Sequence, residues 1–171
     1  KEPIAYLFKE KEFWSNNLIV NTNVLIPRPE TELLVDKLIK YYRDSSPFVL
    51  DVGTGSGCIV VSLLKERPKC TATAIDISLK AINVAKTNAK LHQLENKINF
   101  INIDIDKYKS YNYDLIISNP PYINSIEFNR LDEDIKLHEP KIALSGGFDG
   151  FRDIKKVIVV SKKLLKLNVN W

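Results

Sequence analysis

The sequence predicts an α/β fold in which helices cover a mostly parallel β-sheet. Short apolar stretches of strand length alternate with longer stretches of helical periodicity, which is the pattern of parallel strands joined by crossover helices. No helical stretch separates the third predicted strand from the fourth, so that connection is the least regular one. The predicted strands are 48–52, 71–75, 98–103 and 113–118, and the predicted helices are 57–66, 79–91 and 148–166.

The amino-terminal part of the chain is predicted to form a small β-hairpin and one helix. Residues 5–21 alternate between apolar and polar side chains, and Asn16-Asn17 suits a turn between two strands. Residues 30–42 carry apolar side chains at helical spacing, with Thr31 as the expected amino-terminal cap. Residues 1–46 therefore lead into a predicted core domain over residues 47–171.

Length and composition indicate one compact unit. The chain has 171 residues, of which 44% are hydrophobic, enough for a single packed core. The net charge of +4 fits a solvated surface or a partner that itself carries RNA. No apolar run approaches the ~20 residues of a spanning helix, so a cytoplasmic location is expected. Cys58 and Cys70 have no metal-ligand spacing, and no metal is expected.

A glycine-rich turn between the first predicted strand and its helix predicts a cofactor site. Glycines let the backbone turn tightly and pass close to a ligand, and the N–H groups at a helix start suit an anionic group. Asp76 ends the second strand, where a carboxylate accepts hydrogen bonds from ribose hydroxyls. A nucleoside cofactor is expected at this turn, which consists of Gly53, Thr54, Gly55, Ser56 and Gly57.

The spacing of the glycines excludes two common nucleotide sites. A dinucleotide fingerprint needs a glycine at position 58, where this chain has Cys58. A P-loop needs Lys-Ser or Lys-Thr after the turn, and neither dipeptide is present there. The glycine spacing therefore disfavours NAD, and the residues after the turn remove the P-loop interpretation.

The fourth predicted strand ends in a polar and proline-rich segment, Asn119-Pro120-Pro121-Tyr122. Proline cannot donate to a sheet ladder and fixes its own φ, so the strand stops here. The segment holds one side-chain amide and backbone carbonyls at the carboxyl edge of the sheet. These groups are suited to binding an amine or amide NH₂ group.

The glycine turn, Asp76 and the Asn-Pro-Pro-Tyr segment resemble the motifs of class I S-adenosylmethionine-dependent methyltransferases that methylate planar nitrogen. A narrower resemblance is to the protein-(glutamine-N5) methyltransferases of peptide chain release factors. Three upstream segments carry it, and Pro-Arg-Pro-Glu-Thr-Glu is the part most restricted to that family. The segments are Glu2-Pro3-Ile4-Ala5-Tyr6-Leu7, Glu12-Phe13-Trp14 and Val24-Leu25-Ile26-Pro27-Arg28-Pro29-Glu30-Thr31-Glu32.

The resemblance implies a Rossmann-like fold and methyl transfer from S-adenosylmethionine to a glutamine side-chain amide of a release factor. It implies that the Asn119 side-chain oxygen and the Pro120 carbonyl accept the two N–H bonds of that amide. Tyr122 would pack against the amide plane, and Pro121 would complete the substrate site. Asp104 would accept from the adenine amino group, with Ile105 against the ring.

The resemblance also implies a helical domain before the Glu-Pro-Ile-Ala-Tyr segment and further strands after the last helix. The chain is therefore expected to be incomplete, with carboxyl-terminal strands missing. Two other functions remain open from the residues alone. One is methylation of an exocyclic amine of RNA or DNA, although no basic face or target-recognition segment is evident and nucleic acid is expected to be only an indirect partner. The other is a non-catalytic fragment that binds S-adenosylmethionine.

Overall fold

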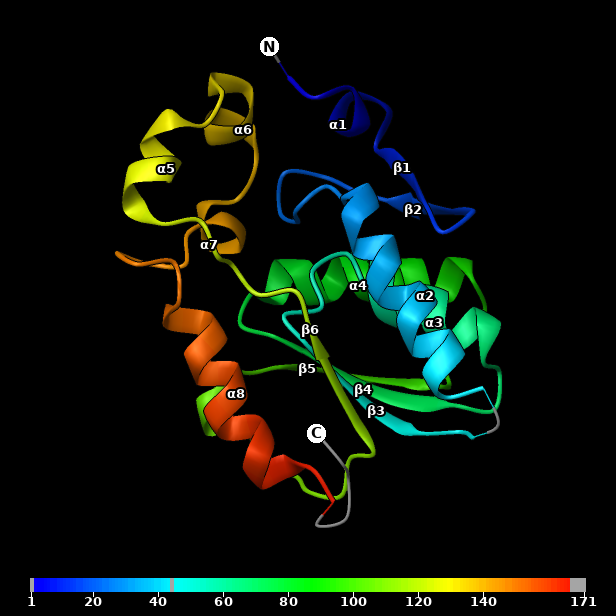
Figure 1. Cartoon of the computed structure of the whole chain (residues 1–171). Helices are drawn as coiled ribbons and strands as arrows, with labels where there is room; N and C mark the ends of the chain where they lie inside the picture. Colours follow the sequence, from blue (N-terminus) through cyan, green and yellow to red (C-terminus); the bar gives the residue numbers. More distant parts are fainter. Residues whose placement is uncertain (1, 44, 167–171) are drawn as a thin grey trace.

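The computed structural model describes residues 2–43 and 45–166, and these contain one parallel sheet of four strands with helices on both faces (Figure 1). The strand order is β5-β4-β3-β6, and all three neighbouring pairs are parallel. This confirms the predicted α/β architecture. The strands are β3 (Phe48–Val52), β4 (Thr71–Asp76), β5 (Ile98–Asn102) and β6 (Leu115–Ser118).

The two faces of the sheet bury different hydrophobic clusters because successive side chains of a strand point to opposite faces. Val49 belongs to the cluster under α2, α3 and α4, whereas Leu50 belongs to the cluster under α8. Figure 1 shows the same division, with α8 on the opposite side of the sheet from the other three helices. These helices are α2 (Glu32–Tyr41), α3 (Cys58–Glu66), α4 (Leu79–Leu91) and α8 (Arg152–Leu164).

The connection from β5 to β6 is irregular, as the sequence predicted. It contains only a short 3₁₀ helix, η2 (Ile105–Lys107), against which α8 packs. After α8, Leu165 forms an isolated parallel bridge with Tyr113. The predicted absence of carboxyl-terminal strands concerns the chain after residue 166 and lies outside the described residues.

The hairpin is present, but its predicted boundaries and turn are wrong. Its first predicted residues form a short helix, α1 (Ile4–Phe8), and the strands are β1 (Glu10–Phe13) and β2 (Asn16–Ile19). The turn is at Trp14-Ser15, whose φ angles are 50° and 53°. Asn16 is not in the turn but is buried in β2, where its side chain donates to the Trp14 carbonyl and to Ser62 Oγ of α3.

The predicted helix over 30–42 divides into two parts. A 3₁₀ turn, η1 (Pro29–Thr31), precedes α2, and Thr31 already has helical angles (φ −69°, ψ −20°). Its hydroxyl makes no capping hydrogen bond, so the predicted capping role of Thr31 is wrong.

Three short helices that the sequence did not predict lie between β6 and α8, beyond the carboxyl end of the sheet (Figure 1). Asn124 caps the first of them by accepting from the N–H groups of Ile126 and Glu127. The predicted start of α8 at 148 is too early, since residues 146–150 form a glycine turn. The helices are α5 (Ser125–Arg130), α6 (Glu133–His138) and α7 (Lys141–Leu144).

A fully buried amide, Asn88 on α4, joins the hairpin to the glycine turn. Its Nδ2 donates to the carbonyls of Ile19 (2.9 Å) and Ser56 (2.8 Å), and its Oδ1 accepts from the Ile19 N–H (2.7 Å). One side chain thereby satisfies both backbone groups of Ile19, which forms the last pair of the hairpin ladder with Glu10.

Replacement of this amide should destabilise the protein strongly. Asn88→Ala leaves buried backbone groups without partners, and we expect the free energy of unfolding to fall by about 3 kcal/mol. Urea denaturation followed by circular dichroism measures the change. Asn83→Ala, at an exposed position of the same helix, is the control and should change it by less than about 0.5 kcal/mol. Equal effects of the two substitutions would contradict this role of Asn88.

Candidate functional site

The register of the sheet brings three polar or glycine positions to one edge. Val52 pairs with Ile75 of β4 and with Ser118 of β6. The next residue of each strand or loop is Gly53, Asp76 and Asn119, so these three positions lie together at the carboxyl edge. In open α/β sheets this edge is where ligands bind.

The glycine turn requires glycine at several positions because its backbone is left-handed there. Gly53, Gly55 and Gly57 have φ angles of 71°, 57° and 81°. The N–H groups of Gly53 and Thr54 both donate to the Ile75 carbonyl (2.9 and 3.1 Å), which fixes the turn against β4. The donors left for an anionic ligand are those of the first turn of α3, which precede its first intrahelical bond, from Val61 to the Gly57 carbonyl.

Asp76 links the glycine turn after β3 to the start of α4. Its carboxylate accepts from the N–H groups of Gly55 (3.0 Å) and Ser78 (2.8 Å). Burial raises the pKa of Asp76, and these two hydrogen bonds oppose the increase. A carboxylate has about four acceptor positions, so Asp76 retains capacity for the hydroxyls of a ribose.

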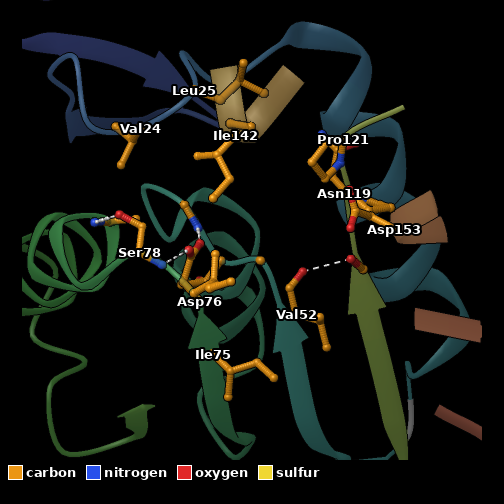
Figure 2. A pocket seen from close by; sticks show the side chains of 18 of the residues that line it. Val24, Leu25, Val52, Ile75, Asp76, Ser78, Asn119, Pro121, Ile142 and Asp153 are labelled. Carbon is orange, nitrogen blue, oxygen red and sulfur yellow. Dashed lines mark hydrogen bonds between the residues drawn. The ribbon is translucent and has the colours of Figure 1, made fainter. Parts of the chain in front are cut away.

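A cavity of about 350 Å³ opens at this edge of the sheet. Figure 2 shows Leu25 and Ile142 facing Ile75 and Asp76 across it. The cavity is mainly apolar, with polar groups from the strand ends, as expected for a site that binds a nucleoside. Gly57 alone among the predicted cofactor residues does not line it; the lining residues from that set are Gly53, Thr54, Gly55, Ser56, Asp76, Asp104, Ile105 and Asn119.

Asp104 lies at one side of this cavity and is held by α8. Lys156 Nζ is 2.7 Å from an Asp104 carboxylate oxygen and 2.8 Å from one of Asp106. Burial is the largest single influence and would raise the pKa of Asp104, but the hydrogen bonds from Lys156 and the Asp106 N–H, together with the charges of Lys156 and Lys107, lower it overall. Asp104 is therefore ionised and can accept, and its hydrogen bond to an adenine amino group stays a prediction.

An ion pair between the half-buried Arg28 and the buried Glu139 holds the opposite wall of the cavity. Arg28 lies 2.6 Å from Glu139, whose side chain is only 2% exposed. Glu139 also accepts from the Ile26 N–H (3.3 Å), and Tyr6 supports the same wall by donating to the Val24 carbonyl (2.7 Å). Removal of one member of such a pair leaves a buried charge without compensation. The segment containing Pro-Arg-Pro is therefore fixed to the loop between α6 and α7.

Asn119 lies between this cavity and a second one of about 420 Å³. Asn119 and Pro120 line both cavities, whereas Pro121 lines only the first and Tyr122 only the second. The Asn119 Nδ2 donates to the Thr31 hydroxyl at 3.3 Å. Tyr122 is 62% exposed and therefore available to a ligand that enters from the second cavity.

The Asn-Pro-Pro-Tyr segment is supported from behind by the glycine turn before α8. A Cβ at Gly146 would lie 2.8 Å from the Pro121 carbonyl oxygen, and a Cβ at Gly150 would lie 2.4 Å from that of Tyr122. The backbone also pairs here, since Ile123 donates to the Leu144 carbonyl (3.0 Å). Only glycine allows this close approach.

Some groups noted in the sequence lie away from both cavities. Phe13 is 1% exposed and belongs to the hydrophobic core under α2 and α3.

Within residues 2–43 and 45–166, no group of His, Cys, Asp or Glu is arranged to hold a metal ion. In the same part of the chain, every helix is too short or too polar to cross a membrane.

The fold and the edge site together are those of the Rossmann-like methyltransferase class, with a glycine turn after the first strand of the sheet and an acid at the end of the second. The chain belongs to the methyltransferase small domain family, whose model matches residues 29–135. The solved hMettl16 catalytic domain, in complex with the MAT2A 3'UTR hairpin 6, has a similar fold with a TM-score of 0.63. It is 17% identical and covers 85% of this chain, which covers 56% of that structure.

Two curated relatives are more similar in sequence. The release factor glutamine methyltransferase of Caulobacter vibrioides is 38% identical over 97% of this chain, and that of Coxiella burnetii is 42% identical over 99% of it. The chain covers 58% and 60% of these two relatives, so it spans a little over half of their length.

Several residues of the site were missed by the sequence analysis. Glu139 and Lys156 act through partners distant in the chain, and Ile142 lies on a helix too short to show periodicity. The sequence held an indication of Glu139 only. Arg28 lies between two prolines in an otherwise apolar segment, and a cation fixed in this way needs a carboxylate as its partner.

Substitutions at two glycines of the turn before α8 should distinguish the effect of backbone strain from the effect of a steric clash with the Asn-Pro-Pro-Tyr segment. Gly147 and Gly150 both have positive φ (90° and 79°), but only a Cβ at Gly150 meets the Tyr122 carbonyl. We expect Gly150→Ala to reduce methyl transfer about tenfold more than Gly147→Ala, because displacement of reacting groups is costly. Steady-state kinetics at equal folded fraction test this. Equal losses in the two variants would show that strain alone is responsible.

The buried carboxyl of Asp51 should make stability depend on pH. Asp51 accepts from the Thr54 hydroxyl (2.7 Å), but its Oδ1 has no partner, and burial raises its pKa from 3.8 to about 7. Between these values the folded state binds the extra proton, so the free energy of unfolding falls as pH rises, by up to about 1.4 kcal/mol per pH unit.

Asp51→Asn should remove this part of the pH dependence. Urea denaturation at pH 5 and pH 8 should then show a smaller difference between the two conditions than in the unmodified protein. Asp36→Asn, at an exposed ion pair on α2, is the control and should leave the difference unchanged. If Asp51→Asn retains the full difference, another group causes it.

Proposed function

We propose that this protein transfers a methyl group from S-adenosylmethionine to the side-chain amide nitrogen of a glutamine in a peptide chain release factor. The observation that carries this proposal is the position of Asn119, which lines both cavities at the carboxyl edge of the sheet. The names of the curated relatives support the substrate. A cytoplasmic location, where release factors act, belongs to the same proposal.

The first cavity suits the nucleoside part of S-adenosylmethionine. Asp76 has remaining acceptor capacity for the ribose hydroxyls, and Ile105 offers an apolar surface for the adenine ring, with Asp104 beside it. The carboxylate of the methionine part would lie at the amino-terminal end of α3, where backbone N–H groups are directed outward. These residues would hold the cofactor without any metal.

When bound, the cofactor supplies a methyl group on a sulfonium, and a neutral thioether remains after transfer. An amide nitrogen is a weak nucleophile because its lone pair is delocalised, so the protein must act mainly by positioning. The Asn119 Oδ1 and the Pro120 carbonyl would accept the two N–H bonds of the glutamine amide and stabilise positive charge on its nitrogen. The proton then leaves to water, and Tyr122 packs against the amide plane.

Two cavities with a shared wall suit a reaction between two ligands. The cofactor would occupy the first cavity, and the glutamine side chain would enter through the second, past Tyr122. Asn119 and Pro120 are then the residues that both ligands approach. Methyl transfer needs the attacking nitrogen in line with the bond that breaks, and entry from the opposite side provides this alignment.

Replacement of the proposed amide-binding residue should abolish transfer but retain the cofactor. Asn119→Ala removes one of two acceptors, and we expect kcat to fall by about 100-fold or more with purified release factor and labelled S-adenosylmethionine. The dissociation constant of the cofactor should change by less than about threefold, because its other contacts remain.

The control variant is Asn99→Ala, at an exposed position on β5. It should label the release factor as the unmodified protein does. Bulk RNA is offered in a parallel reaction. Label in RNA but not in the release factor would replace the proposed substrate, and cofactor binding without label in either would indicate a binding domain without this activity.

A further inference from the structure

Thr31 has a structural position that helix capping does not explain. The residue is 9% exposed, makes no capping hydrogen bond, and lines both cavities. Its hydroxyl accepts from the Asn119 Nδ2 at 3.3 Å, across 88 positions of sequence. This is the side chain through which the Pro-Glu-Thr turn contacts the Asn-Pro-Pro-Tyr segment.

We infer that Thr31 is a positioning residue that holds the Asn119 side chain at the wall shared by the two cavities, with Nδ2 toward Thr31 and Oδ1 toward the substrate nitrogen. This inference rests on the proposed function. The two ends of an asparagine amide have nearly the same size, and only hydrogen bonds distinguish them. With Nδ2 held by Thr31, Oδ1 is the end left to accept from a substrate.

The hydroxyl is itself held on a fixed backbone. The Thr31 N–H donates to the Arg28 carbonyl (3.0 Å), and Arg28 is anchored by Glu139 at 2.6 Å. On the other side, Glu32 accepts from the Trp14 N–H (2.8 Å) at the turn of the hairpin. The Thr31 hydroxyl therefore offers the Asn119 side chain a hydrogen-bond partner in a fixed position.

The orientation determines which chemical group the site accepts. Oδ1 of Asn119 and the carbonyl of Pro120 present two acceptors, which match the two donors of an NH₂ group. A hydroxyl has one donor and would leave one acceptor unpaired, at a cost in a desolvated site. The rotated amide would present donors to the substrate N–H bonds and repel them. The arrangement that Thr31 supports thus suits a primary amide or amine better than an alcohol.

Two variants at this position test the inference. Thr31→Val has nearly the same shape and lacks the hydroxyl, whereas Thr31→Ser retains the hydroxyl. We expect Thr31→Val to lower kcat about tenfold, which corresponds to the loss of one hydrogen bond in the transition state. Thr31→Ser should recover at least half of the activity. The dissociation constant of S-adenosylmethionine should stay within about twofold in both variants.

A purely structural role would give a different result. If Thr31→Val lowers kcat only in proportion to its unfolded fraction, or if Thr31→Ser is as slow as Thr31→Val at equal folded fraction, the inference is wrong. Full activity of Thr31→Val would also overturn it.

A second measurement does not depend on turnover. The side-chain NH₂ resonance of Asn119, assigned by its loss in Asn119→Ala, should show slower hydrogen exchange in the unmodified protein than in Thr31→Val. Equal exchange rates would overturn the inference even if no release factor is methylated. Slower exchange without methylation would support the orientation and reject the proposed substrate, so the two failures are distinguishable.

Discussion

The parallel register of three strands is the constraint on which the rest of this structure depends. β3 lies between β4 and β6, and its last residue, Val52, pairs with the residues that precede Asp76 and Asn119. Because side chains alternate along a strand, a shift of one residue in either pair would turn the strand-end group to the other face of the sheet. The proposed cofactor half and the proposed substrate half of the site meet only in the observed register.

Hydrogen bonds at the ends of the strands convert this register into a defined site. Asp76 holds the glycine turn through Gly55, and Asn88 holds the same turn from α4 through the Ser56 carbonyl. The walls that cover the cavity come from other parts of the chain and are joined by Arg28 and Glu139. The sheet therefore provides the rigid edge of the site. The Arg28–Glu139 ion pair, between residues distant in sequence, holds the segments that cover the cavity.

The parts of the fold that the sequence predicted are those determined by local pattern. The strand over 48–52 has the predicted limits because its apolar run is bounded by proline and glycine, and the glycine turn follows from backbone needs alone. The errors occurred where a distant partner decides the outcome. Asn16 was expected in a turn but is buried against Ser62, and Thr31 was expected as a cap but binds Asn119. Such partners leave no periodic trace in the chain.

The two halves of the site differ in how much of the chain they need. Asp76, Gly55 and the first turn of α3, at the proposed cofactor end, belong to the sheet and its first crossover, and the amino-terminal segment adds only the cover of this cavity, with Leu25 and Arg28. The proposed substrate end also involves Thr31, which η1 brings against the end of β6. Damage to the amino-terminal segment should therefore affect the orientation of Asn119 before it affects the fold of the sheet. On this argument, the polar groups of the proposed cofactor end are fixed by the sheet, whereas the proposed acceptor end depends on one further long-range contact, between Thr31 and Asn119.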